Sequence, residues 1–160
     1  DSTLRMAGII AGRFPWIMLK NMYDMEHVIY RGEQMHSFNF VFGARNSDGT
    51  PRSLINDATG DIDPEMVERW KNYDISLYVR TNWQQLKPDL QGKIRVSVGS
   101  QDNFLLNYPV HLFDDESKKL DAGFVFGYYP GDHFTVSTPE YKAAGYQFLQ
   151  QKYNELGIKN

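Results

Sequence analysis

The chain has 160 residues, of which 41% are hydrophobic and 23% charged, so we expect a folded globular domain and not a disordered segment. Its net charge of −3 offers no basic surface that could neutralise several phosphates, which argues against nucleic acid as a partner. No apolar stretch reaches the roughly 20 residues of a membrane-spanning helix, and the absence of cysteine excludes disulfides and thiolate chemistry.

The first ninety residues show a less regular pattern than the rest of the chain. Residues 14–28 (FPWIMLKNMYDMEHV) predict a helix. Phe38, Phe40 and Phe42 alternate with other residues, which is the spacing of a strand with one aromatic face. We therefore expect a helix followed by one strand in this part of the chain.

A long loop and a short helix come next. Residues 43–63 are polar and rich in glycine, aspartate and proline, which is typical of a loop. Asp63 and Pro64 predict the start of a helix, because an aspartate side chain caps free backbone N–H groups and proline suits the first helical position. This helix is expected to end near Lys71.

The remaining residues, 91–160, give the clearer pattern. Residues 94–98 (IRVSV) form a short β-branched run between two glycines, which predicts a strand. A helix is expected from about residue 104 to residue 120, with Pro109 in its first turns.

A second strand and a final helix complete this half. Residues 123–128 (GFVFGY) predict the strand, and Thr138 offers an N-cap with Pro139 at the first position of a helix that runs to about Leu156. The order strand, helix, strand, helix is typical of parallel strands joined by a right-handed crossover. The predicted fold class is therefore α/β.

Two residues with catalytic potential follow the two predicted strands. Asp102 lies four residues beyond Val98, and His133 lies five residues beyond Tyr128. Parallel strands end at the same edge of a sheet and lie about 4.8 Å apart, so two loops there can bring a carboxylate to an imidazole. The order acid, then histidine, matches the end of the Ser…Asp/Glu…His triad of α/β-hydrolases.

The residue types suit this chemistry. Histidine titrates near neutral pH, so it can remove the proton of a serine and return it to the leaving alcohol. A carboxylate orients the imidazole and stabilises its cation. We therefore take Asp102 as the candidate acid and His133 as the candidate base.

The segment from Gly49 to His133 resembles the C-terminal half of α/β-hydrolases of the esterase branch, related to enterochelin-esterase and esterase D-like proteins. The resemblance rests on four stretches in the same order: GTPRSLINDATGDID (49–63), WKNYD (70–74), LQGKIRVSVGSQD (90–102) and GDH (131–133). In that family the acid follows a strand ending in Val-Gly-x-x-Asp, and the histidine lies in a Gly-x-His loop after the last strand. The resemblance thus implies the C-terminal portion of an α/β-hydrolase fold, with Asp102 and His133 as triad residues.

The nucleophile of such a triad is missing from the sequence. No Gly-x-Ser-x-Gly occurs, Ser97 lies within a predicted strand, and Ser100 lies in the loop just before Asp102. We expect the serine and the oxyanion hole upstream of this chain, which would leave the isolated chain inactive. The alternative is a degenerate, non-catalytic hydrolase-like module that acts in binding or assembly.

Other polar residues have simpler interpretations. Asp132 is expected to form a turn, and no histidine spacing typical of a zinc site occurs. A group of acidic residues lacks the Asp-x-Asp-x-Asp-Gly order of a calcium loop. The members of this group are Asp57, Asp61, Asp63 and Glu65. The histidines expected to be structural are His27, His36 and His111.

These expectations define the organisation of the chain and its partners. We expect one partial domain, in which residues 1–90 form a cap, loop and helical region and residues 91–160 carry the acid and base. We expect no metal and no organic cofactor, and a small-molecule or carbohydrate-linked ester as substrate. A sheet cut through its middle exposes an edge, so we expect association with an N-terminal half of the same protein or with a second copy. The start at Asp1 suggests a processed product, and the resemblance favours a secreted or periplasmic bacterial protein.

Overall fold

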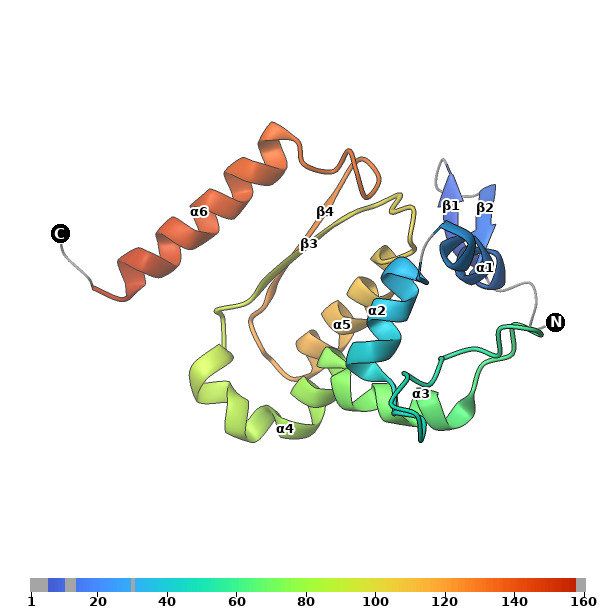
Figure 1. Ribbon diagram of the computed structural model, residues 1–160. Coiled ribbons are helices and arrows are strands. Elements are labelled where there is room, and N and C mark those ends of the chain that lie inside the picture. The colour runs from blue at the N-terminus through green and yellow to red at the C-terminus, as the bar shows by residue number, and fades with distance from the viewer. Residues whose placement is uncertain (1–5, 11–13, 30, 158–160) are drawn as a thin grey trace. The chain divides into compact units, whose positions relative to one another are not determined.

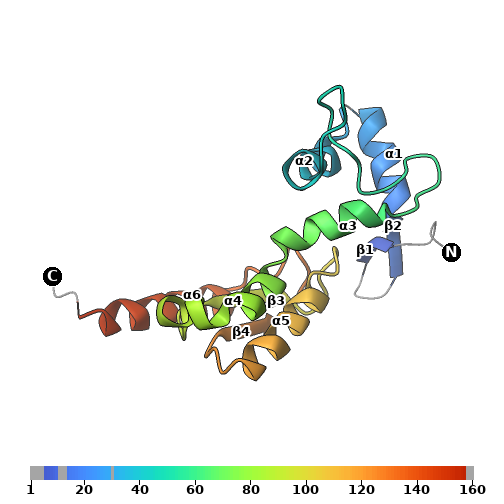
Figure 2. The ribbon, with the colours of Figure 1, turned by 90° about the horizontal axis from the view of Figure 1, so that it is seen from below.

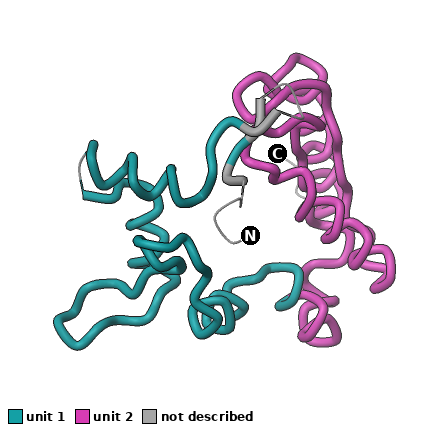
Figure 3. Tube along the Cα trace, turned by 90° about the vertical axis from the view of Figure 1, so that its right-hand side faces the viewer, with its two compact units in different colours: residues 1–78 teal, residues 79–160 magenta. Residues whose placement is uncertain are grey.

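A computed structural model describes residues 6–10, 14–29 and 31–157. The chain divides into two compact units, Asp1–Tyr78 and Val79–Asn160 (Figure 3). Each unit has a hydrophobic cluster of its own, whereas the sequence led us to expect a single partial domain divided near residue 90. The division falls earlier because Val79 and Trp83 pack with Ala122, which lies in the second unit.

Unit 1 combines a β-hairpin with short helices. Its elements are β1 (Met6–Ile10), β2 (Phe14–Met18), α1 (Leu19–Ile29), α2 (Glu33–Phe42), α3 (Pro64–Trp70) and the 3-10 helix η2 (Lys71–Tyr73). Strands β1 and β2 pair antiparallel, and α1 lies against α2 (Figure 2). The buried centre of this unit consists of Tyr23, Met35 and Ile55.

Two predictions for this unit are wrong. The helix expected over residues 14–28 begins only at Leu19, because residues 14–18 form β2. The strand expected from Phe38, Phe40 and Phe42 is the second half of helix α2.

The buried residues of α2 recur with the spacing of a helix. Met35 and Asn39 lie four residues apart and are both buried, at 8% and 3% exposure, whereas Phe38 and Phe40 are exposed. Asn39 accepts hydrogen bonds from the Tyr23 hydroxyl and from the backbone N–H of Leu54. Phe42 is half-buried against Trp70 and Tyr73, so the alternating phenylalanines point to different sides of a helix and do not form one face of a strand.

The loop and the capped helix of unit 1 are confirmed. Residues 43–63 contain no helix and are closed by two isolated bridges. Asp63 caps α3, since one carboxylate oxygen accepts from the backbone N–H of Glu65 at 2.9 Å and of Met66 at 3.4 Å. Arg52 pairs with the other oxygen at 2.6 Å.

Unit 2 contains the predicted strand–helix–strand–helix order. Its elements are α4 (Ile75–Leu90, which begins in unit 1), β3 (Arg95–Gly99), α5 (Asn107–Lys119), β4 (Val125–Tyr129) and α6 (Pro139–Glu155). Strands β3 and β4 pair parallel and in step, from Arg95 opposite Val125 to Gly99 opposite Tyr129. Both α5 and α6 contact β3, and Figure 1 shows them on opposite sides of the strand pair. The fold is thus mixed α/β with a small parallel sheet.

The boundaries in unit 2 differ from the expected ones at the start of α5. This helix begins at Asn107, three residues later than predicted, because residues 104–106 wrap around Asp102. Helix α6 begins as predicted, with the Thr138 hydroxyl accepting from the backbone N–H of Tyr141. Helix α4 was not predicted.

The core of unit 2 holds the sheet against α4 and α5. Trp83 is 5% exposed, donates its indole N–H to the carbonyl of Leu120 at 3.0 Å, and meets the ring of Phe124 edge-on. Ala122 is fully buried beside it. This packing fixes the start of β4, and therefore the strand that leads to His133.

Candidate active site

The loops that follow β3 and β4 continue the pairing of the two strands. The backbone N–H of Ser100 donates to the carbonyl of Tyr129 at 2.8 Å, and that of Gln101 donates to the carbonyl of Gly131 at 3.0 Å. A Cβ atom on Gly99 would lie 2.6 Å from the Gly131 carbonyl oxygen, so this approach requires glycine at position 99. Main-chain contacts therefore hold the two loops together on the strand side of Asp102 and His133.

The predicted contact between Asp102 and His133 is confirmed. Nδ1 of His133 lies 3.0 Å from Oδ2 of Asp102. The Asp102 side chain is 3% exposed, whereas the imidazole side chain is 43% exposed. Because a carboxylate only accepts, Nδ1 donates the proton of this hydrogen bond, and in the neutral imidazole Nε2 then keeps its lone pair. This is the tautomer that a general base needs.

The second carboxylate oxygen of Asp102 is held by the loop that follows it. Oδ1 accepts from the backbone N–H groups of Phe104 at 2.9 Å and of Leu106 at 3.3 Å. Leu105, between these two residues, has a left-handed backbone with φ 63°. Such a conformation costs a residue with a side chain roughly 1–2 kcal/mol. The strained residue thus lies between the two backbone amides that hydrogen-bond to the buried Asp102 carboxylate.

Asp132 forms the turn that carries His133, as predicted. Its Oδ1 accepts from the backbone N–H groups of Phe134 and Thr135 and from the Thr135 hydroxyl, at 2.8 to 3.0 Å. These bonds, first of all the one from the Thr135 hydroxyl, lower the pKa of Asp132. Asp132 therefore serves the backbone of the loop, and Asp102 is the acid that meets the imidazole.

Asn103 is a site residue that the sequence did not reveal. It is 8% exposed, and its Oδ1 accepts from the backbone N–H of His133 at 3.1 Å. Its side chain is also hydrogen-bonded to that of Asp132. The available signal was an amide residue directly after the acid in a short loop, and such residues are common in turns.

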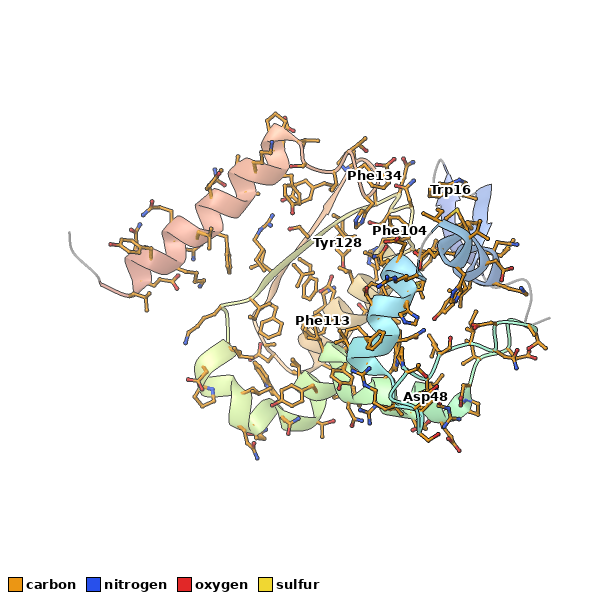
Figure 4. All side chains as sticks on the ribbon, viewed as in Figure 1. Trp16, Asp48, Phe104, Phe113, Tyr128 and Phe134 are labelled. Carbon is orange, nitrogen blue, oxygen red and sulfur yellow. The ribbon has the colours of Figure 1, made fainter. Side chains whose placement is uncertain are left out.

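Two phenylalanine rings flank the imidazole. Phe104 meets His133 edge-on at 5.0 Å between ring centroids, Phe134 does so at 5.5 Å, and the two phenylalanines are 6.0 Å apart. Figure 4 shows both rings at the loop ends of β3 and β4. Phe134 is 69% exposed, so an apolar ring faces solvent beside the imidazole.

No serine in the described ranges is hydrogen-bonded to His133. Ser97 lies within β3, and its hydroxyl accepts from the guanidinium of Arg95. Ser100 is exposed, and its carbonyl accepts from the Asn107 side chain at 3.4 Å. Ser97 lies inside a strand, and Ser100, in the loop from β3 to α5, lacks the Gly-x-Ser-x-Gly surroundings of an esterase nucleophile.

The other histidines contact aromatic rings. His111 stacks on Tyr128, with ring centroids 4.1 Å apart and planes 8° apart, and His36 meets Phe40 edge-on. The Tyr128 hydroxyl donates to Asp114 at 2.9 Å, which joins α5 to β4. Burial, followed by this hydrogen bond, raises the pKa of Tyr128.

Metal-binding groups and membrane-spanning helices are absent from the part of the chain that the structure describes. That part contains no group of three or more histidine, aspartate or glutamate side chains that could hold a metal ion. Nor does it contain a helix long and apolar enough to span a bilayer. Comparisons with protein families, with curated proteins and with solved structures find no match to this chain.

Proposed function

We propose that this chain supplies the acid and the base of a serine carboxylic-ester hydrolase with the α/β-hydrolase fold. The observation that carries the proposal is the hydrogen bond between Asp102 and His133 at the carboxyl edge of a parallel strand pair. The buried acid orients a half-exposed imidazole, and Nε2 is the nitrogen left to meet a reacting group.

The proposed reaction uses His133 twice. A serine from a segment outside these residues gives its hydroxyl proton to Nε2 while its oxygen attacks the ester carbonyl carbon. The tetrahedral intermediate then expels the alcohol, which takes the proton from Nε2 and leaves an acyl-serine. Water repeats both steps and releases the acid. Asp102 stabilises the imidazolium in each half-reaction without accepting the proton.

The test uses the complete reading frame that contains this chain. We expect a Gly-x-Ser-x-Gly sequence upstream of Asp1 and hydrolysis of 4-nitrophenyl acetate by the complete protein. His133→Gln should lower kcat by about 10⁴-fold or more, as for loss of the base in serine hydrolases. His111→Gln is the matched control, because this histidine lies in the same unit and only stacks on Tyr128.

The isolated 160-residue chain is expected to show no turnover that depends on His133. A complete protein that lacks the upstream serine sequence would overturn the proposal and favour a non-catalytic binding module. Equal turnover by the wild-type protein and the His133→Gln variant would overturn it as well.

A further inference from the structure

Asn103 connects the loop of the acid to the loop of the base at two points. Its Oδ1 accepts the backbone N–H of His133, and its side chain also bonds to the carboxylate of Asp132. An amide side chain can accept at its oxygen and donate from its nitrogen, so one residue serves both partners. The side chain is nearly buried, at 8% exposure, where an unmade hydrogen bond is costly.

The position of this contact matters for the direction of the imidazole. Main-chain pairing joins the loops as far as Gly131, through the backbone N–H of Gln101. Beyond Gly131 the contacts are made by side chains: Asp102 and Asn103, in the loop after β3, bond to residues of the loop after β4. Asp102 holds the ring of His133, and Asn103 holds its backbone and the residue before it.

We infer that Asn103 is a positioning residue that fixes the backbone of His133, so that Nδ1 reaches Asp102 and Nε2 stays free to act as a base. Its importance for catalysis rests on the proposed esterase function, whereas its effect on the imidazole does not. The ring of a histidine turns about two side-chain torsions, so its direction follows from where its backbone is held and from its one carboxylate partner.

The test reads the tautomer of His133 in the 160-residue chain itself, through the ¹⁵N chemical shifts of the imidazole. The wild-type chain should show the tautomer with the proton on Nδ1. Asn103→Leu keeps the approximate volume and removes the acceptor. It should shift the tautomer ratio of His133 by about fivefold or more, the effect of losing one hydrogen bond. Asn107→Leu is the matched control, because Asn107 bonds to the same loop at Ser100 and should leave the ratio unchanged.

An exchange of the Asn103 and Asp132 side chains distinguishes a loss of positioning from a loss of folding. Asn103→Asp alone places two carboxylates together and should disturb His133. Combined with Asp132→Asn, it restores one acceptor for the His133 N–H and one amide donor between the two side chains. The double variant should therefore recover the wild-type tautomer.

Three results would overturn the inference: a wild-type ratio in Asn103→Leu, no recovery in the double variant, or mixed tautomers in the wild-type chain. Because neither ester nor serine is needed, failure of the esterase proposal is a separate result. A complete protein without turnover would refute that function while the tautomer measurements would still decide the role of Asn103.

Discussion

Replacing Asp102 by asparagine reverses one hydrogen bond at the acid while it preserves the size of the side chain. In the wild-type chain Oδ1 accepts from the amides of Phe104 and Leu106, and Oδ2 accepts from His133. An asparagine oxygen can keep the two amides, which places its NH₂ group opposite Nδ1 of His133. Nδ1 must then accept, so the proton moves to Nε2. In a complete esterase this tautomer cannot receive the serine proton, and kcat should fall about 10⁴-fold.

The cost in folding free energy follows from the three hydrogen bonds. Bonds to a charged group contribute about 1.5–3 kcal/mol and neutral ones about 1 kcal/mol, so Asp102→Asn should cost about 2 kcal/mol. Asp102→Ala removes every acceptor and leaves the amides of Phe104 and Leu106 and the imidazole without their partner, which should cost about 3–5 kcal/mol. A unit of about eighty residues has roughly 4–12 kcal/mol of stability. The asparagine variant should therefore fold, and the alanine variant should be marginal.

Both effects can be measured in the 160-residue chain. Imidazole ¹⁵N shifts report the tautomer, and the indole N–H of Trp83, which bonds to Leu120 within unit 2, follows unfolding of that unit in urea. Ser97→Ala, within β3 and away from the His133 contact, serves as a control. An asparagine variant with the wild-type tautomer and the wild-type urea midpoint would show that the acid does not orient His133.

Two further variants test the framework of the site. Gly99→Ala places a Cβ 2.6 Å from the Gly131 carbonyl oxygen, so it should lower the free energy of unfolding by about 1–3 kcal/mol and separate the loops. Ser100→Ala is the control and should be neutral. Equal urea midpoints for the two variants would contradict this. Burial and the bond to Asp114 raise the pKa of Tyr128, so the folded state keeps a proton that the unfolded state releases above about pH 10. Stability should therefore fall as the pH rises from about 9 to 11, and Tyr128→Phe should reduce this slope; an unchanged slope would exclude the mechanism.

The strands of unit 2 and the edge at which Asp102 and His133 meet could be predicted because local signals agree there. Glycines bound the β-branched run of β3, and Thr138 and Pro139 mark the start of α6. Parallel pairing then places both strand ends at one edge, which is why Asp102 and His133 meet. The contact between Asp102 and His133 could be predicted from the parallel direction of the two strands, without knowing how the side chains of the core pack.

The errors arise where tertiary contacts decide the structure. Helix α2 carries its alternating phenylalanines on different sides, while buried Asn39 bonds to Tyr23 and Leu54, which lie far from it in sequence. Asn103 was missed for a similar reason. Its partners lie 29 and 30 residues further along the chain, and only the close approach of the two loops brings them together.

The close passage of Gly99 beside Gly131 has a consequence for how the sequence can drift during evolution. Main-chain hydrogen bonds do not depend on side-chain identity, and they set the spacing between the loops that carry acid and base. Helix α5, by contrast, is joined to β4 by side chains, through the hydrogen bond from Tyr128 to Asp114. Exposed positions of the helices can therefore change during evolution more easily than Gly99, where any side chain would meet the Gly131 carbonyl and disturb the spacing of Asp102 and His133.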